Sequence, residues 1–246
     1  MQLYDQIIKD VLARLSARPA RSYSYSAAKA WKDSGESELV MLRDAAFELG
    51  GDSKPAVNFS CVTSDTSFVD KDEIIVIGRD LSEISSSVPF ARLAVCLIDD
   101  IEVEEGDTEP LFRAIQDIDF VKYHVYPEGY MVRTSSENHR EQVRISKKAK
   151  AGGVSFEKIG CDYIQHYKKD PNIKAVKLIF ITDPEVDYKL LAKDAKTVHD
   201  ITLTLSKILE GMPTDCGSCK LKPICDEVEG MKELHFGKNK AEFKAM

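Results

Sequence analysis

Four short apolar runs along the chain predict buried β-strands. The runs cover residues Ala56–Thr63, Glu73–Ile77, Phe90–Ile98 and Val176–Thr182. They are nearly continuous rather than alternating, which is typical of strands that are covered on both faces. The pattern therefore predicts a sheet with further layers packed against it.

Around these runs, apolar residues recur every three or four positions, which predicts amphipathic helices. The expected helices cover residues 3–16, 111–121, 156–168 and 183–208, with a short basic helix at Gln142–Ala151 that ends at Gly152 and Gly153. Residues 123–136 are expected to be irregular, and residues 20–45 to form an extended connection with a helical piece.

Strands that alternate with helices of crossover length predict an α/β fold. We expect an open, mainly parallel sheet with flanking helices, an N-terminal helical segment and a C-terminal metal-binding extension. The corresponding domain boundaries are residues 1–45 for the helical segment, 46–211 for the α/β domain and 212–246 for the extension.

Composition and charge narrow the function classes. The chain has 246 residues, of which 43% are hydrophobic, and its net charge of −7 argues against general binding to nucleic acid. No apolar run reaches about 18 residues and no signal-peptide pattern opens the chain, so we expect a cytoplasmic protein that does not enter a membrane. An acidic run at residues 99–109 predicts a solvated loop or, alternatively, an acidic partner surface.

The most distinctive chemistry lies near the C-terminus, where Cys216, Cys219, Cys225 and His235 have the spacing C-x2-C-x5-C-x9-H. Three thiolates and one imidazole complete a tetrahedral zinc site, and the same set suits a 4Fe–4S cluster. On spacing alone the two metals are nearly balanced, and free thiols in a flexible tail are the plain alternative. His235 is either a ligand or an ordinary side chain, and Cys161, which we expect to be a buried structural cysteine, is a rival fourth ligand.

A basic segment precedes this cluster. Its cationic side chains are Arg133, Arg140, Arg144, Lys147, Lys148 and Lys150, opposed only by Glu137 and Glu141. Arginine and lysine in such a segment can hold phosphate groups, although a solvated helix face is an equal alternative. No Walker A or Gly-x-Gly-x-x-Gly motif supports a nucleotide site.

From about residue 45 to 237 the chain resembles acetyl-CoA synthase, the beta subunit of the carbon monoxide dehydrogenase/acetyl-CoA synthase complex. The stretches that carry the resemblance are Phe47-Glu48-Leu49-Gly50-Gly51, Pro55-Ala56, Val76-Ile77-Gly78-Arg79-Asp80, Glu128-Gly129-Tyr130, Val143-Arg144-Ile145-Ser146-Lys147-Lys148 and Ile179-Phe180-Ile181-Thr182-Asp183. Their order, ending at a cysteine cluster, makes the match. The resemblance implies the family's middle α/β domain and the start of its metal domain.

The resemblance also implies which residues hold metal. In that family four cysteines bind a 4Fe–4S centre that is bridged to a two-nickel site. Cys216, Cys219 and Cys225 match the first three, and His235 stands at the fourth position. The resemblance therefore favours a 4Fe–4S cluster over zinc and adds weight to His235 as a ligand.

Other family features are missing from this sequence. The later Cys-Gly-Cys element that holds nickel is absent, so we do not expect a complete acetyl-CoA-forming centre. Met131 stands near the position of a tryptophan that the family links to coenzyme A. A coenzyme A-like ligand on Arg133, Arg140, Arg144, Lys147 and Lys148 is therefore the weaker expectation.

These observations predict an iron–sulfur protein that acts as an electron-transfer or interaction module in one-carbon, corrinoid-linked metabolism. Its expected partner is a redox protein or a corrinoid/methyl-transfer protein. The alternatives are a reduced acetyl-CoA-synthase-like enzyme with a nickel-containing centre, and a zinc-stapled binding domain. No Ser/His/Asp or Cys/His catalytic set is readable in the sequence.

Overall fold

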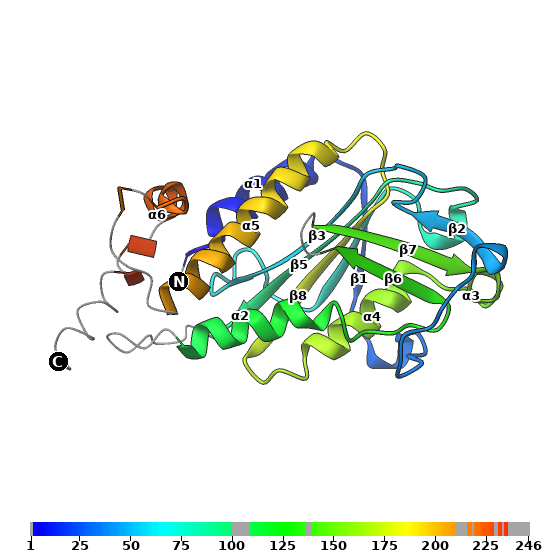
Figure 1. Ribbon diagram of the computed structural model, residues 1–246. Helices are drawn as coiled ribbons and strands as arrows, with labels where there is room; N and C mark the ends of the chain where they lie inside the picture. The colour runs from blue at the N-terminus through cyan, green and yellow to red at the C-terminus, as the bar shows by residue number, and fades with distance from the viewer. Residues whose placement is uncertain are drawn as a thin grey trace.

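The computed structural model describes residues 2–99, 109–135, 139–209, 216–217, 219–228, 231–232 and 234–235. Two β-sheets with flanking helices make up these residues (Figure 1). Residues 100–108 of the acidic run lie outside the described residues, so the structure does not bear on that prediction.

The larger sheet has five strands in the order β1-β4-β8-β5-β3. Their bounds are β1 Ala20–Ser24, β3 Ala56–Thr63, β4 Glu73–Ile77, β5 Phe90–Ile98 and β8 Ile173–Ile181. The pairs β3–β5 and β4–β8 are parallel, whereas β5–β8 and β1–β4 are antiparallel. Every residue of β5 is buried, as its continuous apolar run predicts.

The smaller sheet has three antiparallel strands in the order β2-β7-β6. Their bounds are β2 Ala45–Leu49, β6 Tyr130–Ser135 and β7 Arg140–Ser146. The central strand β7 alternates between buried and half-buried residues, with Glu141, Val143 and Ile145 turned inward. This side of β7 meets β3 and β5 of the larger sheet.

Helices flank the two sheets. Their bounds are α1 Asp5–Ser16, α2 Glu109–Val121, α3 Lys147–Ala151, α4 Phe156–Tyr167, α5 Tyr188–Leu209 and α6 Lys222–Glu227. Figure 1 shows α1 and α5 together along one side of the molecule and α2 and α4 along the other. Helix α4 packs on β4 and β8, where Phe156 stacks on Phe90 and Phe180, and α5 packs on β3.

The α/β class, the flanking helices and the N-terminal helix are confirmed. Two local predictions are wrong. The first concerns the expected basic helix: Arg140–Ser146 is strand β7, and only Lys147–Ala151 is helical. The reason is that β7 pairs on both sides, so its backbone groups are satisfied by β2 and β6. Residues 130–135, expected to be irregular, form β6 in the same sheet.

Candidate functional site

The cysteine cluster lies after α5, around the short helix α6. Cys216 is exposed, and Cys219 and Cys225 are half-buried, with Cys225 inside α6. Pro223 lies in the first turn of α6, a position where its missing N–H costs no hydrogen bond. Helix α6 packs on α5, and Ile224 and Met231 join the hydrophobic core. The extension is therefore anchored to the α/β domain.

The thiols of Cys216 and Cys219 lie close enough to Cys225 to affect its titration. Burial raises the pKa of Cys225, and the neighbouring Cys219 and Cys216 raise it further. Lys232 lies close to the cluster. Its pKa is raised mainly by a hydrogen bond to Asp226, and the nearby Cys216 and Cys225 add to this rise. In the ranges that the structure describes, no three ligand atoms of this cluster lie within 4.8 Å of one another.

The two residues considered for the fourth position occupy different environments. His235 is buried, with 5% of its surface exposed, in the same C-terminal extension as the cysteines. Cys161 is fully buried in α4 and accepts a hydrogen bond from the Ser26 backbone N–H at 3.5 Å. Figure 1 shows α4 well apart from α6, so the fold does not bring Cys161 to the cluster.

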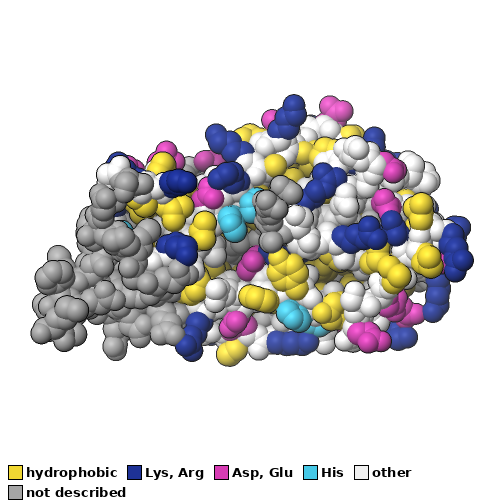
Figure 2. Space-filling model, in the orientation of Figure 1, with side chains coloured by type: hydrophobic (Ala, Val, Ile, Leu, Met, Phe, Trp, Pro, Cys, Tyr) yellow, Lys and Arg dark blue, Asp and Glu magenta, His cyan; other side chains and the backbone are white. Residues whose placement is uncertain are grey.

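The basic segment lies on the smaller sheet and α3, at the end of the molecule where Lys and Arg gather in Figure 2. Arg140 donates to the carbonyls of Gly50 and Lys54, and Arg144 donates to the Glu48 carboxylate and the Val40 carbonyl. These hydrogen bonds join β7 to the chain on either side of β2.

Three further cations of the segment are more open to solvent. Arg133 is exposed on β6, and exposed Lys147 donates to the Arg43 carbonyl. Exposed Lys148 pairs with Glu128 at 2.7 Å. Lys148 and Lys32 together lower the pKa of Glu128 to about 2. Binding of a cofactor by these five residues stays a prediction.

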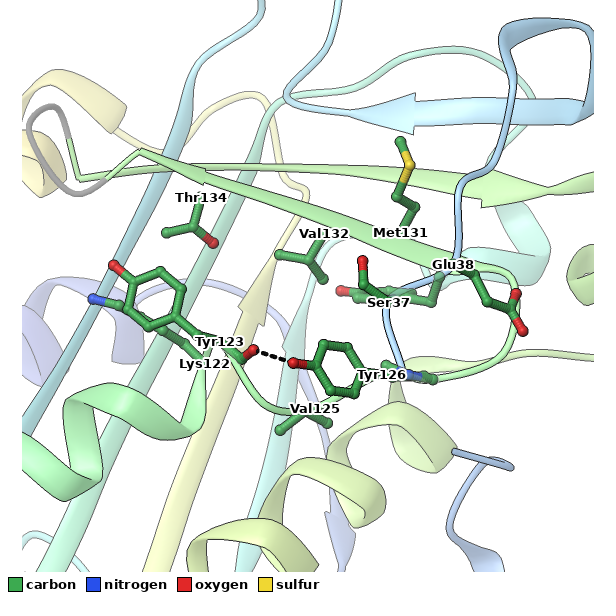
Figure 3. A pocket seen from close by; sticks show the side chains of 11 residues that line it. Ser37, Glu38, Lys122, Tyr123, Val125, Tyr126, Met131, Val132 and Thr134 are labelled. Atoms are coloured by element: carbon green, nitrogen blue, oxygen red, sulfur yellow. Dashed lines mark hydrogen bonds between the residues drawn. The ribbon is translucent and has the colours of Figure 1, made fainter. Parts of the chain in front are cut away.

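A cavity of about 200 Å³ lies beneath β6 (Figure 3). Its lining residues are Ser37, Glu38, Lys122, Tyr123, Val125, Tyr126, Pro127, Tyr130, Met131, Val132 and Thr134. The Tyr126 hydroxyl donates to the Tyr123 carbonyl, and the buried Tyr130 hydroxyl has no hydrogen-bond partner within the described residues. Sequence reasoning missed this cavity, although the three tyrosines within residues 123–130 were the available signal.

These features define the class of protein: an α/β domain of two sheets, with a cavity beside the smaller sheet and an extension that carries the cysteines. A scan against protein-family models matches residues 31–186 to the CO dehydrogenase/acetyl-CoA synthase complex beta subunit. The match covers more than half of the chain, so the chain belongs to that family. A separate search among curated proteins finds no match.

The family match covers both sheets except β1, and it ends before the cysteine cluster. The earlier identification of an acetyl-CoA synthase-like protein is thus confirmed for the α/β domain. No helix within the described ranges is both long enough and apolar enough to cross a membrane.

Proposed function

We propose that this acetyl-CoA synthase-like chain is an iron–sulfur protein in which Cys216, Cys219, Cys225 and His235 hold a 4Fe–4S cluster. The observation that carries the proposal is the gathering of the three cysteines around α6, on an extension that packs against α5. Soft thiolates are the donors that such clusters require, and the buried His235 supplies a fourth donor from the same extension.

The preference for a cluster over a single zinc ion rests on the family to which the chain belongs, because three thiolates and one imidazole suit either metal.

When bound, a 4Fe–4S cluster supplies one-electron transfer. The chain's own residues would set how that electron is exchanged. Exposed Cys216 and half-buried Cys219 put the site near the surface, which suits contact with a partner. The neutral imidazole of His235 removes one negative charge relative to a thiolate, which raises the reduction potential.

The family is that of a subunit of a complex, which supports a protein partner. We propose that this partner is a redox protein or a corrinoid/methyl-transfer protein of one-carbon metabolism. The C-terminal extension would then be an electron-transfer or interaction module attached to the α/β domain. A coenzyme A-like ligand on the basic segment is a separate and weaker part of the proposal.

The test is anaerobic reconstitution of the full chain with iron and sulfide, followed by absorption spectroscopy of single variants. Cys225→Ser should lose most of the visible absorption of the cluster, whereas Cys161→Ala should keep it, because Cys161 lies in α4. His235→Cys should keep the cluster and lower its reduction potential. A cluster that survives Cys225→Ser unchanged contradicts the ligand assignment.

Metal analysis of the same preparations separates the alternatives. One zinc ion in a colourless protein would overturn the proposal in favour of a zinc-stapled domain. Stoichiometric nickel would favour a reduced acetyl-CoA-synthase-like enzyme, with Cys219 as the residue that matches the family's bridging cysteine.

A further inference from the structure

Three side chains with metal-binding atoms meet far from the cysteine cluster. Asp162 and His166 lie one turn apart on the same face of α4, and Asp33 comes from the connection before β2. One ligand atom from each residue lies within 4.8 Å of the others. All three residues lie within residues 31–186, the region that matches the family model, so none of them belongs to the C-terminal extension.

Hydrogen bonds fix the orientation of the His166 ring. Its Nδ1 lies 3.0 Å from the Asp162 carbonyl oxygen, which only accepts, so Nδ1 carries a proton in this contact. The other ring nitrogen, Nε2, lies 3.3 Å from Asp33 Oδ2. In neutral imidazole Nε2 presents a lone pair to a carboxylate oxygen. A cation between the two atoms, or a second ring proton, removes that repulsion.

The distance between these two atoms is that of two ligands on one ion. Two bonds of about 2.0–2.1 Å that meet at the tetrahedral angle separate their donor atoms by about 3.3–3.4 Å. A metal ligand of this kind commonly donates its other ring N–H to a carbonyl, as His166 does.

A second observation concerns Asp162 itself. Its side chain is buried, with 2% exposed, and its Oδ2 has no hydrogen-bond partner in the part of the chain that the structure describes. A carboxylate oxygen that is removed from water without a partner is costly, and a bound cation offsets that cost. This unpartnered oxygen belongs to the same carboxylate that meets His166, whose Nδ1 lies 3.5 Å from Asp162 Oδ1.

Asp33 is held in place from the other side. Its Oδ1 accepts the Gly35 N–H at 2.6 Å, and its Oδ2 accepts the Tyr126 N–H at 3.3 Å. Tyr126 also lines the cavity beneath β6. Three protein ligands leave a coordination position for water or for a small ligand.

We propose that Asp33, Asp162 and His166 bind one divalent first-row transition-metal ion. Two carboxylates and one imidazole suit Mn²⁺, Fe²⁺ or Zn²⁺ better than they suit Ca²⁺ or Mg²⁺, because the last two ions prefer sites made of oxygen ligands alone. The ion closes the contact between the α4 helix and the connection before β2.

The test uses Mn²⁺ as the probe, because thiolates select softer metals and the cysteine cluster then does not compete. Electron paramagnetic resonance of the full chain should detect one bound Mn²⁺ per chain with nitrogen coupling from an imidazole. Asp162→Asn and His166→Gln should each weaken binding at least tenfold, and His166→Gln should also remove the nitrogen coupling.

A matched control lies just after the end of α2. His124 Nδ1 contacts the Phe120 carbonyl oxygen at 3.0 Å with the same four-residue spacing, but His124 is not in the metal-ligand group. His124→Gln should leave binding and the nitrogen coupling unchanged. If a helix variant fails to fold by circular dichroism, Asp33→Asn, which changes a connecting segment, provides the same test. Failure to bind stoichiometric Mn²⁺, or binding that persists in His166→Gln, overturns the site.

Discussion

Arg92 of β5 and Glu141 of β7 form a fully buried ion pair between the two sheets, with 0% of either side chain exposed. Arg92 Nε donates to Glu141 Oε1 at 2.7 Å, and Asn58 donates to Oε2 at 3.0 Å. The guanidinium also lies 4.6 Å from the centre of the Tyr163 ring on α4. Burial alone would lower the pKa of Arg92, but Glu141, together with Tyr163 and Tyr167, outweighs burial and raises the pKa.

Glu141→Gln should therefore destabilise the protein by about 3–5 kcal/mol, because it leaves the Arg92 charge buried without its counter-ion. Urea unfolding followed by circular dichroism measures this change. The control is Glu128→Gln, which breaks the pairing with Lys148 and Lys32 on the surface and should change stability much less. Equal effects of the two substitutions would contradict the importance of the buried pair.

Gly160 sets the approach of α4 to the larger sheet. A Cβ atom at this position would lie 2.6 Å from Ile74 Cγ1 on β4, which is closer than packed atoms tolerate. Gly160→Ala should lower the free energy of unfolding by about 1–3 kcal/mol despite the better helix propensity of alanine. Gly152→Ala is the matched control, since its Cβ would meet its nearest atoms at 3.4 Å. Thermal unfolding of the two variants should separate them clearly.

His139 makes stability depend on pH. Its ring centre lies 4.9 Å from that of His199, with the two rings tilted by 46°. The pKa of His139 is lowered by burial first and then by His199 and Lys122, while Asp200 opposes the shift and Lys196 adds to it. In the unfolded state the His139 ring takes up a proton at about pH 6.5, whereas in the folded state it does so only at a lower pH. Stability therefore falls as the pH drops below about 6.5.

His139→Asn tests this dependence, because asparagine tolerates the backbone φ of 49° at this position. Between about pH 7.5 and about pH 5, the variant should lose less unfolding free energy than the wild type. Chemical unfolding at a series of pH values gives both curves. Parallel curves would show that His139 does not contribute to the slope.

The basic segment yields a binding prediction. Lys147 and Lys148 are exposed at the start of α3, where they can reach phosphate groups. If a coenzyme A-like ligand binds there, replacing both lysines by alanine should weaken binding about tenfold in calorimetric titrations with coenzyme A. Lys9→Ala on α1 should have no effect. An unchanged affinity in the double variant would assign the segment to structure alone.

The sequence predicted the elements that its own pattern determines. Strands β3, β4, β5 and β8 were readable because they are buried on both faces, and α1, α4 and α5 because their apolar residues keep helical spacing. Strand β7 was not readable, because its short alternation of apolar and polar residues is followed directly by the helix-forming residues Lys147–Ala151. Its strand state depends on pairing with β2 and β6, which a local pattern does not contain.

The functional residues divide in the same way. The cysteine cluster was readable because its ligands are close in sequence. The Asp162–His166 pair has a recognisable helical spacing, but its partner Asp33 lies far earlier in the chain. Only the tertiary fold brings Asp33 to α4, and only burial shows that Asp162 has an oxygen without a partner among the residues that the structure describes.

The iron–sulfur proposal is tested most directly by chemical analysis of iron and acid-labile sulfide in anaerobically purified protein, with zinc and nickel measured in the same samples. The account predicts about four iron and about four sulfide per chain, with a broad visible absorption that reduction bleaches. Protein that binds no iron or sulfide under anaerobic reconstitution would contradict it.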